Sequence, residues 1–158
     1  MPTYSVDGIT WYYTLDASNN ATIGDGDGSG DSATTSGDLS GAKTIPSTVG
    51  TNYPVTGISS RAFQNFSGLT SITIPDSVTT IGQYAFFYCT GLTSVTLGNS
   101  VISIGDTAFS NCTNLTSINI PASVITIGTE AFYSCPSLVS INIPDSVTTI
   151  GTSSFTNT

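Results

Sequence analysis

The chain has no histidine and few charged residues. Only 8% of its 158 residues are charged, against about a quarter in an ordinary soluble domain. The chain has ten acidic residues and two basic ones, Lys43 and Arg61, so the formal net charge is −8. This charge disfavours binding to nucleic-acid phosphates and to anionic membrane surfaces. Without histidine the chain also lacks the usual general base near neutral pH.

Long apolar segments are missing too. No run approaches the roughly 18 apolar residues that a membrane-spanning helix needs, so we expect no membrane insertion. The N-terminus, Met1 to Tyr4, lacks the basic and apolar regions of a secretory signal peptide. Two interpretations stay open: the chain is not secreted by the general route, or its signal has been removed.

What the sequence does contain is a 23-residue repeat. Several columns of residues recur in one register, which chance does not produce. The columns are Phe63, Phe86, Phe109, Phe132 and Phe155; Ile58, Ile81, Ile104, Ile127 and Ile150; Val55, Val78, Val101, Val124 and Val147; Gly82, Gly105, Gly128 and Gly151; and Leu69, Leu92, Leu115 and Leu138.

Each unit reads as two short extended segments and one turn. Residues 69–74 alternate at period two, which predicts a strand that ends at Pro75. Residues 78–81 predict a second extended stretch, and Gly82 a turn at positive φ. Residues 84–89 predict one helical or 3₁₀ turn. One unit is too small to bury its own apolar face, so we expect successive units to stack as coils of a solenoid.

The columns read L-x-x-I-x-I-P-x-S-V-x-x-I-G-x-x-A-F-x-x-C, as in residues 69–89. This pattern resembles the BspA-like, or Treponema pallidum-type, leucine-rich repeats, from about Ile45 to Thr158. The resemblance implies a β-dominated α/β solenoid of leucine-rich repeats, often found in surface proteins with adhesive roles. Some positions depart from the pattern: Gly98 and Asn99 replace Pro-Asp, Ser59 replaces the repeating Gly, and Phe66 stands in the Cys column.

The first part of the chain does not follow the repeat. Residues 4–15 predict a β-hairpin with a turn at Asp7-Gly8, and residues 21–23 a third strand. Because solenoid ends need a cap, we expect residues 1–43 to form a β-rich N-terminal cap. Residues 44–158 are expected to form the solenoid, with one irregular partial coil and then units starting at 69, 92, 115 and 138. Residues 50–54 read as a hairpin insertion in the first coil.

Two sets of residues deserve testing as metal or redox sites. In the Gly/Asp loop of residues 24–32, Asp25, Asp27 and Ser29 fit the first half of a calcium loop, but Ser36 stands where the bidentate Glu belongs. We expect a surface loop there, with calcium as the weaker alternative. Cys89, Cys112 and Cys135 form a column. Coils about 4.8 Å apart hold parallel Cβ atoms farther apart than a disulfide prefers, so free buried thiols are expected. No cofactor motif is present.

The outward positions of the predicted strands suggest the functional surface. They are small, polar and uncharged: Ser71, Thr73, Ser94, Thr96, Ser117, Asn119, Ser140 and Asn142. They are either simply soluble strand formers or a ladder that recognises a protein or glycan through many weak hydrogen bonds. A Thr-rich ice-binding face is a further reading, but the Asn residues count against it.

These observations favour a non-enzymatic binding or adhesion scaffold. Ser and Thr are plentiful but lack an activating base, so an enzyme is not expected. The resemblance alone implies an extracellular location at a cell or virion surface. A second hypothesis comes from the C-terminus, because Thr158 falls inside a repeat. An uncapped last coil could dock head-to-tail on another copy and form a filament.

Overall fold

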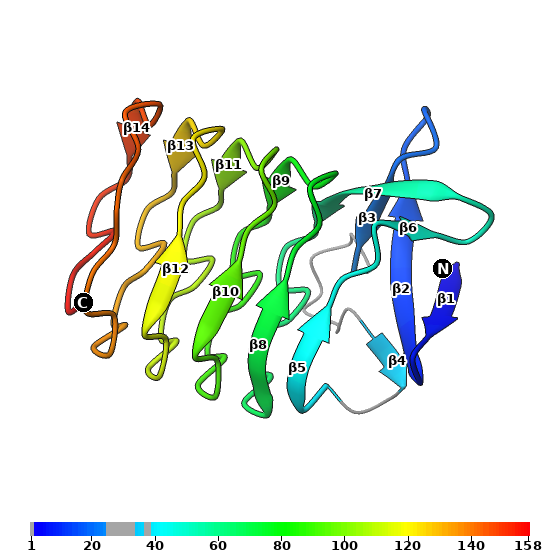
Figure 1. The fold of residues 1–158 in the computed structure, drawn as a ribbon, viewed down its shortest axis with the longest axis horizontal. Helices are drawn as coiled ribbons and strands as arrows, with labels where there is room; N and C mark the ends of the chain where they lie inside the picture. Colours follow the sequence, from blue (N-terminus) through cyan, green and yellow to red (C-terminus); the bar gives the residue numbers. More distant parts are fainter. Residues whose placement is uncertain (1, 25–33, 37–38) are drawn as a thin grey trace.

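The computed structural model describes residues 2–24, 34–36 and 39–158, which form a solenoid with two sheets (Figure 1). One sheet has ten strands, in the order β1-β2-β3-β7-β9-β11-β13-β14, with β4 beside β2 and β6 beside β7. The other has four strands, in the order β12-β10-β8-β5. The strands are β1 (Thr3–Val6), β2 (Ile9–Leu15), β3 (Ala21–Ile23), β4 (Thr34–Ser36), β5 (Gly41–Thr44), β6 (Thr48–Val49), β7 (Tyr53–Ile58), β8 (Leu69–Thr73), β9 (Thr80–Ile81), β10 (Ser94–Thr96), β11 (Ser103–Ile104), β12 (Ser117–Asn119), β13 (Thr126–Ile127) and β14 (Thr149–Ile150).

Successive coils stack in the register that the sequence predicts. In the four-stranded sheet Val95 of β10 lies between Ile72 and Ile118, in parallel pairing. In the larger sheet Ile104 pairs in the same way with Ile81 and Ile127. Each partner is one repeat away in the sequence, so the expected solenoid is confirmed.

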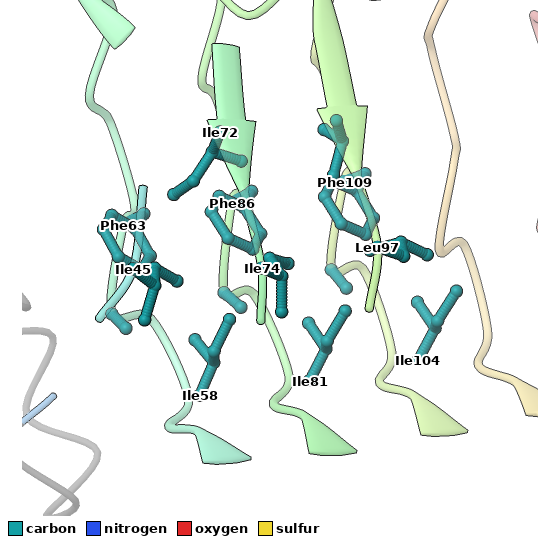
Figure 2. Packing of buried hydrophobic residues seen from close by; sticks show 14 of the residues in the cluster. Ile45, Ile58, Phe63, Ile72, Ile74, Ile81, Phe86, Leu97, Ile104 and Phe109 are labelled. Carbon is teal, nitrogen blue, oxygen red and sulfur yellow. The ribbon is translucent and has the colours of Figure 1, made fainter. Parts of the chain in front are cut away.

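The interior between the two sheets is dry and filled by the repeating columns. Phe63, Phe86, Phe109 and Phe132 are each fully buried, with 0% of their surface exposed. Their rings stack in parallel, with centroids 4.9 to 5.4 Å apart. Figure 2 shows three of these rings beside the isoleucines that close the interior on either side. Burying a large apolar side chain contributes about 1.5–3 kcal/mol, so these columns supply much of the stability.

The turn side of each coil is not helical, contrary to prediction. In the first full coil, residues 69–91, the N–H groups of Ala85 and Phe87 donate to the carbonyls of Gly82 and Tyr84 in the same coil. The alternate N–H groups of Tyr84 and Phe86 instead donate to Asp106 and Ala108 of the next coil. A helix would keep all these donors within its own turns. Bonding between coils therefore replaces it, and the described residues contain no helix.

The repeating glycines allow close packing of neighbouring coils. They do not adopt a positive φ, so the prediction of a positive-φ turn at Gly82 is wrong. Among the described glycines only Gly8, Gly24, Gly41 and Gly50 have positive φ. A Cβ on Gly82 would lie 2.6 Å from backbone atoms of Ser59 and Ser60 in the preceding coil. The absence of a side chain is therefore what lets neighbouring backbones approach at this corner.

The cap begins with the expected hairpin. Val6 pairs with Ile9, and the turn residues Asp7 and Gly8 have φ of 52° and 75°, as a type I′ turn requires. β3 pairs antiparallel with β2 and in parallel with β7, so it connects the cap to the solenoid. The ring of Trp11 packs edge-on against Phe63, 6.1 Å between centroids, and covers the first ring of the stack.

Two features lie where the repeat is irregular. The expected hairpin insertion is present, since β6 pairs antiparallel with the start of β7. β5 pairs in parallel with β8 and crosses the predicted boundary between residues 43 and 44. The division of the chain into cap and solenoid at that residue stays a prediction.

The last unit departs from the pattern on one side. Residues 138–143 form no strand, and β12 is the outermost strand of the four-stranded sheet. In the preceding coils the hydroxyls of Thr93 and Thr116 donate to the carbonyls of Thr70 and Thr93, at 2.9 and 3.0 Å. Val139 takes this position next and has no hydroxyl to continue the ladder. Its side chain is 89% exposed.

Candidate functional site

The strand face is the outer surface of β8, β10 and β12, where the predicted outward residues form two columns. Ser94 pairs with Ser71 and Ser117, and Thr96 with Thr73 and Asn119, all in parallel register. Thr73, Thr96, Ser117 and Asn119 are exposed, whereas Ser71 and Ser94 are half-buried. The residues between them, Ile72, Val95 and Ile118, are buried. Strand alternation therefore places these hydroxyl and amide groups outside, about 4.8 Å apart from coil to coil.

The face extends one coil farther toward the N-terminus than expected. β5 places Ala42 beside Ser71 and Thr44 beside Thr73, and both are exposed. Sequence analysis missed these two residues because Gly41–Thr44 lacks the leucine that opens the other units. A signal was present in Ile45-Pro46, which follows β5 as Ile74-Pro75 follows β8.

At its other end the face loses its regular form. Ser140 and Asn142 are exposed, but they lie outside any strand. They therefore do not share the fixed spacing of the three coils before them. The regular part of the predicted site consists of six residues: Ser71, Thr73, Ser94, Thr96, Ser117 and Asn119.

The chemistry of this face is limited to hydrogen bonding. Its side chains are hydroxyls and amides, each able to donate and accept. None of the six carries a charge or lies in a buried pocket that would activate a nucleophile. The arrangement can recognise a surface with matching polar groups, and its rigid backbone ladder holds the spacing fixed.

The cysteine column is part of the interior and not a reactive site. Cys89, Cys112 and Cys135 are free and fully buried. Each thiol donates to a phenylalanine carbonyl of the preceding coil, as Cys89 does to Phe63 at 2.9 Å. Desolvation raises the pKa of Cys89 to about 12 and of Cys135 to about 11. These thiols therefore stay protonated near neutral pH, which disfavours both nucleophilic attack and metal binding.

No metal-binding cluster appears in residues 2–24, 34–36 and 39–158: no three His, Cys, Asp or Glu side chains come together there. The calcium candidate, Asp25, Asp27 and Ser29, lies outside the described residues.

Two hollows exist that sequence analysis did not find. A groove of about 470 Å³ runs along β11, β13 and β14, with Ser103, Thr126 and Gly128 among its lining residues. A smaller pocket of about 220 Å³ lies where the cap meets the solenoid, between Trp11 and Lys43. Both depend on how coils and cap pack together, which no local sequence pattern encodes.

The repeat itself identifies the family. Residues 47–158 match the model of the BspA type leucine rich repeat region, in six copies. The chain belongs to the BspA-type leucine-rich repeat family. Proteins with these repeats are generally protein-binding or surface scaffolds and are not generally enzymes. No curated protein matched the chain.

Solved structures with the same repeats have the same fold. The T. pallidum leucine rich repeat protein TpLRR is 31% identical over 92% of this chain, with a TM-score of 0.82. A leucine-rich repeat protein from Bacteroides ovatus is 31% identical over 94%, with a TM-score of 0.75. The chain spans 64% and 37% of the lengths of these two proteins.

Two further solved structures are similar to this chain over nearly its whole length. A leucine rich cell surface protein from Faecalibacterium prausnitzii is 28% identical over 99% of this BspA-type chain and 52% of its own length, with a TM-score of 0.63. The pneumococcal vaccine antigen PcpA is 25% identical over 99% of this chain and 42% of its own length, with a TM-score of 0.76. In the described part of the chain, no helix has the length and apolarity needed to cross a membrane.

Proposed function

We propose that this protein is a non-enzymatic binding and adhesion scaffold, whose strand face contacts a protein or glycan partner. The observation that carries the proposal is the in-register ladder of exposed hydroxyl and amide groups on β8, β10 and β12. Its rigidity reduces the conformational entropy lost when a partner binds. The scaffold role of the BspA-type family supports the same function.

The absence of catalytic chemistry in the sequence supports a binding role. The chain has no histidine, so its abundant hydroxyls lack the usual base that activates a nucleophile near neutral pH. The cysteine thiols, its strongest potential nucleophiles, are buried and held protonated. We therefore infer that the protein acts by binding.

We further propose that the protein acts outside the cell, on a cell or virion surface. Relatives of the same family support this placement, because they include a cell surface protein and a pneumococcal antigen. A surface rich in uncharged hydroxyl and amide groups suits contact with extracellular proteins and glycans.

The experiment combines Thr73→Lys with Thr96→Lys. Both side chains are exposed, so the double variant should keep its fold while two long charged side chains cover the ladder. Binding to host extracellular proteins should fall relative to the unmodified chain. A matched control, Thr80→Lys with Thr149→Lys, changes two exposed threonines of the other sheet. Binding that survives the first variant, or that only the control removes, would refute the strand face as the contact surface.

A second candidate function is head-to-tail assembly of this chain through exposed apolar side chains of the coil that contains β14. Ile150 of β14 is 48% exposed, whereas Ile127 in the coil before it is 1% exposed. The ring of Phe155 stacks on that of Phe132 and is only partly buried. Light scattering should show growth with concentration if these surfaces dock on the cap of another copy. Polymers that persist after a polar coil is fused to the C-terminus would rule out this contact.

A further inference from the structure

One coil carries an aromatic cluster on its turn edge. The rings of Tyr84 and Phe87 lie edge to face, with centroids 5.4 Å apart, and those of Phe87 and Tyr88 likewise at 4.6 Å. The guanidinium of Arg61, from the preceding coil, lies 5.3 Å from the centre of the Tyr84 ring. Tyr84, Phe87 and Tyr88 are called the aromatic cluster below. It lies on the segment between β9 and β10, outside the strands β8, β10 and β12 that form the strand face.

The cluster is exposed and is confined to that coil. Tyr88 is 48% exposed, and Tyr84 and Phe87 are half-buried. The same three positions in the next coil are small and polar: Thr107, Ser110 and Asn111. The repeat therefore does not require aromatic residues here, and their presence needs another explanation.

Backbone conformation makes Tyr88 an unfavourable choice for this position. Its φ is 58°, in the left-handed region that costs a side chain with a Cβ about 1–2 kcal/mol. Among residues with a side chain, Asn tolerates this region best. Asn65, Asn111 and Asn157 occupy the equivalent position in other coils, and Ser134 in one. A bulky aromatic residue therefore stands where the other coils have Asn or Ser, so the backbone does not account for its presence.

We propose that the aromatic cluster binds a neutral, hexose-containing glycan, with a sugar ring stacked on the exposed ring of Tyr88. The face of an aromatic ring carries negative potential, which attracts the C–H groups on the apolar face of a sugar. Uncharged hydrogen-bonding side chains flank the cluster along the edge, among them Asn65 and Asn111, and can contact sugar hydroxyls. The net charge of −8 disfavours sulfated and sialylated glycans.

The size of the cluster favours a glycan over a protein partner. A stable protein interface buries about 800 Å² on each side around an apolar centre. One exposed and two half-buried rings, each of about 150–250 Å², supply only a small part of that area. The equivalent positions of the two neighbouring coils carry no aromatic ring: they are Arg61, Gln64 and Asn65 before it and Thr107, Ser110 and Asn111 after it. One or two sugar rings match the available apolar area.

The decisive variant is Tyr84→Thr, Phe87→Ser and Tyr88→Asn together. It gives this coil the edge that the next coil already has at Thr107, Ser110 and Asn111, so the fold is expected to persist. Tyr133→Ser is the matched control, because it removes an aromatic residue from the Phe87 column two coils farther on. Circular dichroism and urea unfolding check that both variants remain folded.

An array of neutral hexose and N-acetylhexosamine oligosaccharides, with sulfated and sialylated oligosaccharides beside them, is the probe. The wild-type chain should bind neutral glycans, and the triple variant should bind them about tenfold more weakly or not at all, which is about 1.4 kcal/mol or more. The Tyr133→Ser control and the Thr73→Lys/Thr96→Lys variant should both retain this binding. No binding to neutral glycans, unchanged binding by the triple variant, or preference for anionic glycans would overturn the proposal. Loss of binding only with the lysine variant would also overturn it, since the site would then be the strand face.

Discussion

The rings of Phe86 and Phe109 lie parallel, at an angle of 2° and with centroids 5.0 Å apart. That spacing is close to the strand separation of about 4.8 Å in a sheet. Each ring therefore fills the interior of its own coil and also packs against the ring of the next coil. The stack joins the interiors of successive coils into one continuous core. Removal of a ring should therefore lower the free energy of unfolding most in the middle of the solenoid.

The first prediction tests this stack by truncation. Phe109→Ala should lower the free energy of unfolding by about 3–5 kcal/mol, because it leaves a cavity between two fully buried rings. Phe155→Ala should cost clearly less, since Phe155 has one ring neighbour in the stack and is only partly buried. Urea unfolding followed by circular dichroism measures both values. Equal losses would show that burial within the stack does not govern its contribution.

The second prediction separates the two reasons for a glycine. A Cβ on Gly105 would lie 2.8 Å from the backbone nitrogen of Gln83, so Gly105→Ala must push two coils apart. We expect a loss of about 2 kcal/mol or more, within the usual range for overpacking. Gly8→Ala meets no atom within 4 Å, but its φ is +75°, which costs an alanine about 1–2 kcal/mol.

The two glycine variants should therefore disturb different parts of the protein. Gly105→Ala should also weaken the protection of neighbouring amide hydrogens from exchange, because hydrogen bonds between coils are disturbed. Gly8→Ala should affect only the cap hairpin. A Gly105→Ala variant with wild-type stability and exchange would contradict the close packing of coils.

The sequence predicts the repeat, the core and the hairpin turn well, because each rests on local periodicity. The column of Phe63 and Phe86 could be assigned to the interior without coordinates. The turn conformation at Tyr84 could not, because its N–H bonds to Asp106 of another coil. The role of Gly82 was misjudged for a similar reason, since the atoms that exclude a side chain belong to the preceding coil.

The candidate site shows the same division between local and non-local information. Alternation along the strand placed Ser71 and Thr73 on the outside. The repeat pattern predicts one more strand after β12, but the structure has none there. At this point Val139 replaces the threonine whose hydroxyl bonds to the preceding coil, and its side chain is exposed. Exposure of Tyr88 likewise depends on how the turn is folded.

The third prediction concerns pH and the buried thiols. An exposed thiol has an ordinary pKa near 9.0, whereas burial raises that of Cys89 to about 12 and of Cys135 to about 11. Above pH 9 the unfolded chain loses these protons and the folded chain keeps them. Stability should therefore fall as pH rises from about 9 to 11, by up to about 1.4 kcal/mol per pH unit for each thiol.

A variant with all three cysteines changed to alanine provides the control for this pH dependence. Its starting stability should be lower, but its stability should fall less steeply between pH 9 and pH 11 than that of the wild type. Both proteins share the titration of their tyrosines, so the difference in slope isolates the thiols. Identical slopes would show that the thiols are not kept protonated by burial.

The fourth prediction concerns Trp11, which covers the first ring of the stack. Trp11 is fully buried against Phe63, and among the residues that the structure describes its Nε1 has no hydrogen-bond partner. Trp11→Ala should cost about 3–5 kcal/mol through the cavity it leaves. Trp11→Phe should cost only about 1 kcal/mol, because removal of an unpaired buried N–H, which costs about 1–3 kcal/mol, offsets much of the lost packing. Unfolding is followed by circular dichroism, since Trp11 is the only tryptophan. If Trp11→Phe proves as damaging as Trp11→Ala, the shape of the indole and not its apolar area holds the cap on the solenoid.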